Sequence, residues 1–204
     1  MSGHLYYKSY SKNKMKPLCT LNIKDIIVVI VGYLVYANFY KGYTAYFPTI
    51  PIYPNNKEEV ELVKQHIKTR KQEDIDFFHL TNKSIVAAFL PHVDEKEEEL
   101  EKIVGSLKVN SIVYGNKIFI NRARPAQVCG CIKPIDTSTA ETPAYPAGHA
   151  FQAYLLCKIL CKKYPDKKSV LEKTAKQCDM CRVKAGLHYP SDGEYSKKMV
   201  NIFY

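Results

Sequence analysis

Apolar residues recur at helical spacing along most of this chain, and no stretch of useful length alternates apolar with polar residues as a half-buried strand does. The segment KEEVELVKQHIKTR (57–70) places Val60, Val63 and Ile67 on one stripe and crowds acidic residues into its first turn. A length of 204 residues suits one domain with a sizeable core. The pattern therefore predicts an all-α fold, a helical bundle.

Two further helices are predicted before residue 110. IDFFHLTNKSIVAAFL (75–90) carries a broad apolar face that Pro91 closes. DEKEEELEKIVGSL (94–107) reads as a charged helix with a thin apolar edge, for which Asp94 is the expected N-cap. No internal repeat is present.

A basic and then apolar segment precedes these helices. Four lysines between residues 8 and 16 come before an unbroken apolar run from Ile26 to Ala37, which is short for a membrane span. Three interpretations stay open: a removed signal peptide with Val35 and Ala37 at its cleavage site, a tilted anchor extended by Phe39 and Tyr40, or an apolar helix docked on the domain. The absence of a second such run excludes a multi-spanning membrane protein.

The predicted organisation has three parts. Residues 1–45 are the basic N-terminus with the apolar segment, residues 46–56 (YFPTIPIYPNN) are an extended Pro-rich linker, and residues 57–204 are the helical domain. The N-terminal part predicts a membrane-associated or secretory-pathway protein.

Positive charge is concentrated in the second half of the chain. The net charge is +10 overall, and residues 104–204 hold sixteen basic and seven acidic side chains. Such a surplus suits an anionic partner without choosing among phosphorylated small molecules, nucleic acid and lipid surfaces.

The seven cysteines are expected to be reduced thiols. Their number is odd and they are spread through helical segments, which argues against a closed disulfide framework. Two pairs lie one helical turn apart, yet their spacing matches no zinc module, so no metal site is predicted. The cysteines are Cys19, Cys129, Cys131, Cys157, Cys161, Cys178 and Cys181.

Three short segments contain residues suited to binding an anion. In PAYPAGHAFQAYLLCKIL (143–160), His149 follows a Pro-Ala-Gly turn at the start of an apolar helix, where unpaired N–H groups and the helix dipole favour an anion. In KIFINRARP (117–125), Lys117 and Arg124 lie seven residues apart, so both would project from one face of a helix that Pro125 ends.

The third segment is CRVKAGLHYPSD (181–192). Arg182 falls on the inward stripe of the preceding helix, where a guanidinium needs an anionic partner. Ser191 and Glu194 resemble a capping box that opens the last helix and brings Asp192 within reach of His188. A carboxylate beside an imidazole fixes its tautomer and raises its basicity, although such a pair also occurs as an ordinary helix start.

In this order, Lys-x6-Arg-Pro (117–125), Pro-x-Gly-His (146–149) and Arg-x5-His-x3-Asp (182–192) resemble the three-part phosphate-binding signature of the type 2 phosphatidic acid phosphatase superfamily. The resemblance covers residues 105–204 and is closest to the class A bacterial acid phosphatases, which share the fold of the vanadium haloperoxidases. It implies a helical bundle of that type and no cofactor or metal.

The resemblance also implies a role for each matching residue. His188 would attack phosphorus and form a phosphohistidine while Asp192 orients its ring, and His149 would protonate the leaving group and then activate water. The phosphoryl oxygens would be held by three cations and by the start of the helix, namely Lys117, Arg124, Arg182, Ala147 and Gly148. Fixed cations and a helix N-terminus supply the charge stabilisation that phosphoryl transfer requires.

Two positions depart from the signature. Ala147 stands where the family usually has Ser, which removes a hydroxyl donor and about 1–3 kcal/mol of ligand stabilisation. Cys181 replaces the usual Ser before Arg182. Every cation, both histidines and the aspartate are present, which favours an active enzyme.

The predicted function is hydrolysis of phosphate monoesters through a phosphohistidine. A membrane-tethered lipid phosphate phosphatase and a non-catalytic phosphate-binding protein are the alternatives, and a vanadium peroxidase is disfavoured because those chains are far longer. The expected partner is a phosphorylated small molecule or lipid and not nucleic acid. Membrane contact through residues 26–40 and homo-oligomer formation stay open.

Overall fold

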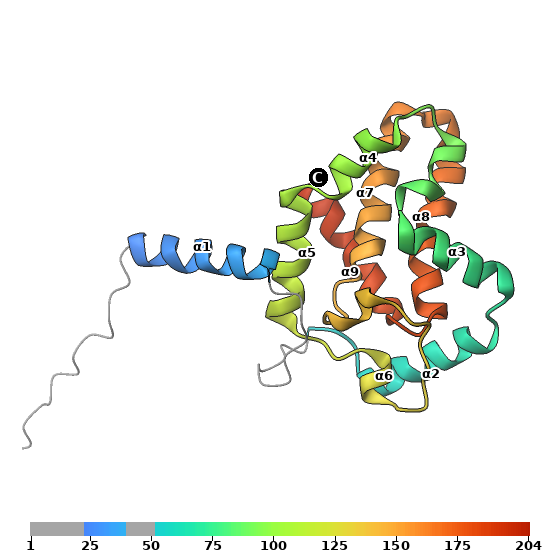
Figure 1. Ribbon diagram of the computed structural model, residues 1–204, viewed down its shortest axis with the longest axis horizontal. Helices are drawn as coiled ribbons and strands as arrows, with labels where there is room; N and C mark the ends of the chain where they lie inside the picture. Colours follow the sequence, from blue (N-terminus) through green and yellow to red (C-terminus); the bar gives the residue numbers. More distant parts are fainter. Residues whose placement is uncertain (1–22, 40–51) are drawn as a thin grey trace, which may run out of the picture.

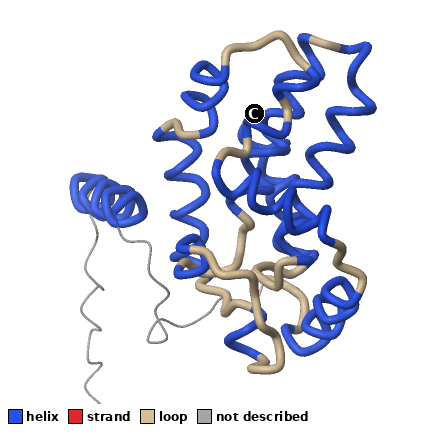
Figure 2. The backbone as a smooth tube through the Cα atoms, turned by 45° about the vertical axis from the view of Figure 1, so that its right-hand side comes forward, coloured by secondary structure: helices blue, strands red, loops and turns tan. Residues whose placement is uncertain are grey.

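The computed structural model describes residues 23–39 and 52–204, and every regular element in these ranges is a helix (Figures 1 and 2). The all-α prediction is confirmed for this part of the chain. The α-helices are α1 (Ile23–Phe39), α2 (Asn56–Lys68), α3 (Gln72–Lys83), α4 (Glu97–Val104), α5 (Leu107–Ile120), α6 (Pro125–Val128), α7 (Gly148–Lys163), α8 (Lys168–Lys184) and α9 (Pro190–Phe203). Short 3₁₀ turns are η1 (Val86–Ala88), η2 (Leu90–His92), η3 (Ser138–Glu141) and η4 (Pro165–Lys167).

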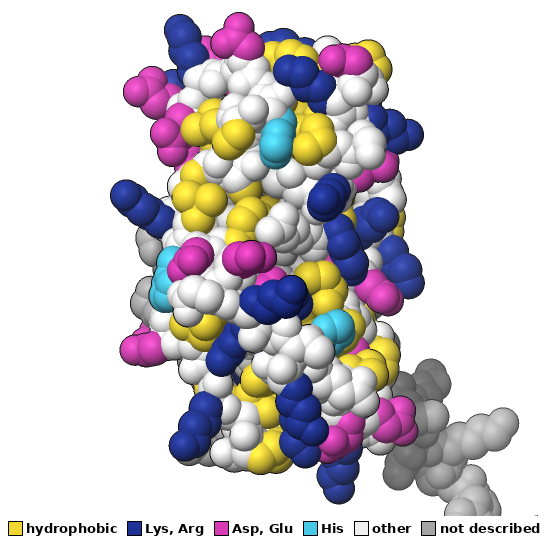
Figure 3. Space-filling view, turned by 90° about the vertical axis from the view of Figure 1, so that its right-hand side faces the viewer, with side chains coloured by type: hydrophobic (Ala, Val, Ile, Leu, Met, Phe, Trp, Pro, Cys, Tyr) yellow, Lys and Arg dark blue, Asp and Glu magenta, His cyan; other side chains and the backbone are white. Residues whose placement is uncertain are grey.

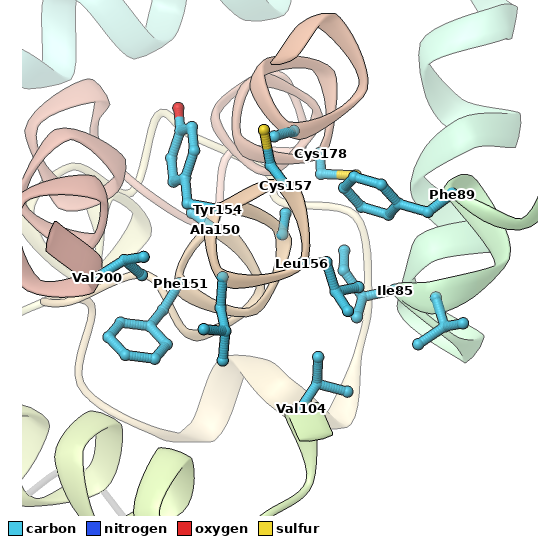
Figure 4. Close-up of a cluster of buried hydrophobic side chains, with 14 of the residues drawn as sticks. Ile85, Phe89, Val104, Ala150, Phe151, Tyr154, Leu156, Cys157, Cys178 and Val200 are labelled. Atoms are coloured by element: carbon cyan, nitrogen blue, oxygen red, sulfur yellow. The ribbon is translucent and has the colours of Figure 1, made fainter. Parts of the chain in front are cut away.

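Helix α7 lies at the centre of the bundle and contacts both α8 and α9 (Figure 4). Phe151, Leu155 and Leu156 on this helix are fully buried. Burial of each such side chain contributes about 1.5–3 kcal/mol, so α7 is a rigid support for the residues at its N-terminus. Charged side chains of both signs cover the face shown in Figure 3.

The helix predicted over residues 75–90 is interrupted. Helix α3 ends at Lys83, because Ser84 is extended and its hydroxyl accepts from the backbone N–H of Ala87 and donates to Glu101. A serine that bonds to nearby backbone competes with helical hydrogen bonding. The chain then continues through η1 and η2, so the prediction of one long helix closed by Pro91 is wrong.

The predicted start of α4 is also shifted. The N-cap is Lys96 and not Asp94. The backbone carbonyl of Asp94 accepts from the hydroxyl of Tyr164, and Glu95 pairs with Lys163. Contacts with the end of α7 therefore keep these two residues outside the helix.

The expectation of reduced thiols is wrong for one pair. Cys129 and Cys131 form a disulfide across Gly130, where a tight turn brings their Cα atoms to 5.1 Å. Four other cysteines are free thiols, Cys157, Cys161, Cys178 and Cys181. Cys19 lies outside the described residues.

Helix α1 contacts α5 and projects from the bundle (Figure 1). Most of its described apolar side chains are exposed, from 45% for Ile26 to 73% for Ile23. No helix within residues 23–39 and 52–204 is long and apolar enough to cross a membrane. Tyr40 and most of the expected linker, residues 46–51, lie outside the described ranges.

Candidate active site

The N-terminus of α7 forms one wall of the candidate site. Ala147 is the N-cap, followed by Gly148 and His149 in the first turn. Ala147 has no side chain able to accept from the free N–H groups of this turn. A serine on α9, Ser196, donates to the carbonyl of Ala147 at 2.9 Å and so ties this helix start to α9.

The turn between α8 and α9 supplies a histidine and a carboxylate. Nδ1 of His188 lies 3.0 Å from Oδ2 of Asp192, and both side chains are buried. Because the carboxylate accepts, Nδ1 carries the ring hydrogen and Nε2 keeps its lone pair. Asp192 Oδ2 also accepts from the backbone N–H of Tyr189 at 2.9 Å, which fixes its direction.

The start of α9 differs from the predicted capping box. Tyr189 is the N-cap, and Asp192 occupies the third helical position, where it accepts from the Tyr189 N–H. Ser191 instead bonds to Glu59. The prediction that Ser191 and Glu194 cap this helix is therefore wrong, although Asp192 lies next to His188 as expected.

Lys117 and Arg124 belong to different helices, which corrects the prediction of one continuous helical face. Helix α5 ends at Ile120 because Asn121 is left-handed, with φ 49° and ψ 47°. Asparagine tolerates this conformation better than most residues. Pro125 then opens α6 with Arg124 as its extended N-cap.

Arg124 nevertheless reaches the histidine. Its guanidinium donates to the backbone carbonyls of Thr142 at 2.7 Å and Leu187 at 2.8 Å, and Nη1 lies 3.3 Å from Nε2 of His188. Lys117 is buried nearby and its Nζ donates to the carbonyl of Pro143. Backbone carbonyls thus hold both cations in place.

Arg182 approaches the site from α8. Its guanidinium donates to Asn82 at 3.0 Å and to Thr81 at 3.4 Å, and it lies over the ring of Phe78. Its Nε is buried and has no hydrogen-bond partner among the described residues. A buried donor without a hydrogen-bond partner costs free energy.

These residues surround a cavity of about 380 Å³. Lys117, Arg124, Gly148, His149 and His188 line it, whereas Arg182, Asp192 and Ala147 are not among its lining residues. The outer wall comes from α5 and α7. Its members are Val109, Asn110, Val113, Tyr114 and Gln152, and the loop before α7 adds Glu141 and Thr142.

Burial disfavours the protonated form of both histidines in the ligand-free site. Burial lowers the pKa of His149 well below its usual value, and the positive charges of Arg182, Lys117 and Arg124 lower it further. Burial likewise lowers the pKa of His188, with Arg124, Lys117 and Arg182 acting in the same direction. Lys117, Arg124 and Arg182 thus concentrate positive charge around the histidines, and a bound anion would neutralise it.

Burial also shifts the pKa values of Lys117 and Asp192. Burial lowers the pKa of Lys117 well below its usual value, and Arg124 adds to that effect. Burial raises the pKa of Asp192 to about 6, against the opposing effect of Arg122. Perturbed groups gathered in one cavity are typical of an active site.

The sequence analysis missed Arg122 and Glu59. Arg122 is fully buried and pairs with both Glu59 and Asp192 at 2.6 Å. The available signal was a second arginine inside the otherwise apolar segment before Arg124. Its partner on α2 could not be read from the sequence. No cluster of three potential metal-ligating side chains occurs within residues 23–39 and 52–204.

Comparison with solved structures gives a likeness in fold. No protein-family model and no curated protein matches the sequence. Among solved structures, the chain resembles the first transmembrane PAP2 type phosphatidylglycerolphosphate phosphatase from Bacillus subtilis, with a TM-score of 0.51 and 16% identity over 85% of this chain and 89% of that chain. At this identity the likeness shows the fold, so the predicted helical bundle is confirmed as the one seen in a PAP2-type protein.

Proposed function

We propose that this protein is a metal-independent phosphatase that hydrolyses phosphate monoesters through a phosphohistidine at His188. One observation carries the proposal: Asp192 accepts from Nδ1 of His188, while Nε2 of the same ring meets Arg124 at the cavity. The PAP2-type fold supports it, and so does the resemblance of the three segments that contain these residues to the signature of that superfamily. The closer likeness to class A acid phosphatases is part of the proposal.

The reaction would proceed in two displacements. Nε2 of His188 attacks phosphorus, the ester P–O bond breaks, and His149 gives its proton to the leaving alkoxide. His149 then takes a proton from water, the water oxygen attacks phosphorus, and the P–N bond breaks. Lys117, Arg124 and Arg182 would stabilise the phosphoryl oxygens, which makes a metal unnecessary for this role.

The proposed general acid needs the substrate in order to be protonated. Burial and the neighbouring cations Arg182, Lys117 and Arg124 lower the pKa of His149 in the empty site, which disfavours its protonated form. A phosphoryl dianion reverses the local charge and raises the pKa of His149. We therefore expect activity to be highest in mild acid.

The decisive experiment is hydrolysis of an aryl phosphate by the full chain, with vanadate as competitor. Turnover should disappear in His188→Ala and persist in His79→Ala, a histidine on α3 outside the site. With labelled substrate, His149→Ala should accumulate a phosphoprotein that is stable to base and labile to acid. Undiminished turnover in His188→Ala would contradict the proposal.

A lipid phosphate is the second candidate substrate. The favouring observation is α1, which exposes apolar side chains and contacts α5, the helix that also lines the cavity. The similar Bacillus protein is a transmembrane phosphatidylglycerolphosphate phosphatase. Ile27→Lys with Ile30→Lys should lower hydrolysis of phosphatidic acid in vesicles while leaving aryl phosphate hydrolysis intact. An equal effect on both substrates would contradict a specific role of α1 in lipid hydrolysis.

A non-catalytic phosphate-binding protein is the remaining alternative, and Ala147 is what supports it. The residue contributes no hydroxyl to the start of α7. Vanadate binding without turnover would establish this function. The proposed domain organisation, with residues 57–204 as the catalytic part, and the membrane or secretory location are to be tested on the same preparations.

A further inference from the structure

Arg122 joins two carboxylates in the interior of the protein. Nη1 donates to Oδ1 of Asp192 and Nη2 donates to Oε2 of Glu59, each at 2.6 Å. All three side chains are at most 7% exposed. Nε donates to Oδ1 of Asn56 at 2.9 Å. The guanidinium therefore ties the first turn of α2 to the first turn of α9.

Aromatic rings hold the plane of this guanidinium. Its central carbon lies 3.8 Å from the centroid of the Tyr189 ring and 4.4 Å from that of Tyr53. An arginine stacked on rings and bonded through a planar fork has little freedom to move. A lysine would keep the charge and lose this geometry.

The two oxygens of Asp192 face different partners. Oδ1 is bonded to Arg122, while Oδ2 accepts from Nδ1 of His188 at 3.0 Å. A continuous row of side chains thus runs from α2 to the cavity, and the charges along it alternate until it reaches the imidazole. The row consists of Glu59, Arg122, Asp192 and His188.

We propose that Arg122 and Glu59 are positioning residues for His188. They act through Asp192, because they fix the orientation and the charge of its carboxylate. The proposal rests on the function proposed above for its catalytic consequence. Removing Arg122 would free Oδ1, so Oδ2 would no longer be aimed at Nδ1. Removing Glu59 would leave Arg122 with one carboxylate in place of two.

Charge gives this row a second effect. Arg122 favours ionised Asp192, whereas burial favours the protonated acid. A protonated Asp192 would donate to Nδ1 and leave the ring hydrogen on Nε2, which removes the lone pair needed for attack. The charged and titratable groups that face Asp192 are Lys117, Arg122, Arg124, His188, Glu59, Asp179, Tyr145 and Tyr189.

The test compares the full chain with Arg122→Gln and Glu59→Gln in aryl phosphate hydrolysis across pH. Loss of the Arg122 charge should move the acidic limb of kcat/KM up by about 1 pH unit and lower kcat about 10- to 100-fold. KM should change less than about twofold, since Lys117 and Arg124 remain in place. Loss of the Glu59 charge should move the same limb down, because the positive charge of Arg122 then acts undiminished.

A matched control removes an ion pair that does not touch the row. Asp74→Asn breaks the contact between Asp74 on α3 and Lys184 on α8, which lie 2.7 Å apart. It should lower stability and leave the pH profile unchanged. Arg122→Lys keeps the charge, so it should lower kcat with only a small shift of the acidic limb. This variant replaces Arg122→Gln in the comparison if Arg122→Gln does not fold.

Opposite shifts in the two variants are the expected result, because a merely structural role would not produce them. Unchanged limbs, or shifts in the same direction, would overturn the proposal. The ring ¹⁵N signals of His188, assigned from His188→Ala, should show the same two opposite shifts without any substrate. If the full chain hydrolyses no phosphate ester, the proposed function fails, and this NMR titration still decides the role of Arg122 and Glu59.

Discussion

Nη1 of Arg124 lies 3.3 Å from Nε2 of His188, so a cation expected to bind phosphoryl oxygens contacts the atom expected to attack phosphorus. In the ligand-free protein the guanidinium donates to the lone pair of Nε2. Its hydrogen bonds to the backbone carbonyls of Thr142 and Leu187 hold it there. A phosphoryl group entering between Arg124 and His188 would contact both side chains. Substrate binding would therefore free Nε2 of His188 from its contact with the guanidinium.

Replacing Arg124 by Lys tests this coupling. The variant keeps the charge and loses the fork that bonds two backbone carbonyls, so kcat/KM for an aryl phosphate should fall about 100-fold. Arg70→Lys is the matched control, because Arg70 donates to a single carbonyl, that of Lys184, away from the cavity. Equal losses in both variants would show that Arg124 has no particular role in the reaction.

Replacing Ala147 by Ser restores a hydroxyl at the N-cap of α7. The hydroxyl can accept from a free N–H of the first turn or donate to a bound phosphoryl oxygen. We expect about 1 kcal/mol of added stability from the first and at least a 10-fold rise in kcat/KM from the second. Thermal unfolding and initial rates measure the two effects separately, with Ala87→Ser in η1 as control. A rise in stability alone would mean that residue 147 does not contact the substrate.

Anion binding should take up a proton. The pKa of His149 lies well below its usual value in the empty site, mainly through burial and then through Arg182 and the other cations. A bound dianion raises that pKa, so between the two values the complex holds a proton that the free protein lacks. Affinity for sulfate, which does not titrate itself in this range, should therefore increase as pH falls through that window.

Titration calorimetry with sulfate in two buffers of different ionisation enthalpy measures the proton uptake directly. His149→Gln should still bind sulfate with much of the uptake lost. Net proton release in the unaltered protein would contradict the assigned electrostatics.

Replacing Gly193 by Ala should disturb the contact between α8 and α9. An added Cβ would lie 1.8 Å from Oδ1 of Asp179, a buried carboxylate that accepts from the hydroxyl of Tyr154 at 2.9 Å. Overpacking of this kind costs about 1–3 kcal/mol of unfolding free energy. Because Gly193 follows Asp192, the shift should also lower kcat. Gly130→Ala, where an added Cβ has no neighbour within 4 Å, should change neither quantity.

Much of the site followed from local spacing. His188 and Asp192 are four residues apart across a helix start, so the backbone alone brings them within bonding distance. His149 lies in the first turn of α7 because the helix begins at Gly148, directly after Pro146 and the N-cap Ala147. The inward stripe of α8 likewise placed Arg182 in the interior, where it is 1% exposed.

Local signals failed where a single residue changed the path of the chain. Helical periodicity continues through KIFINRARP, yet Asn121 in the left-handed conformation ends α5 and directs Arg124 to a separate helix. Ser84 likewise ends α3 although the helical pattern of apolar residues continues beyond it. Both residues are tolerated inside and outside helices, so their tertiary contacts decide which occurs.

The sequence by itself determined the helical class of the described fold, the helix start that carries His149, and the pairing of His188 with Asp192. Only the tertiary structure decided which helices meet, and with them the partners of the buried arginines. Glu59 lies 63 residues from Arg122, and Asn82 lies 100 residues from Arg182. The physical reason is that periodicity reports which face of a helix is buried, whereas the partner of a buried charge depends on the helix that packs against that face.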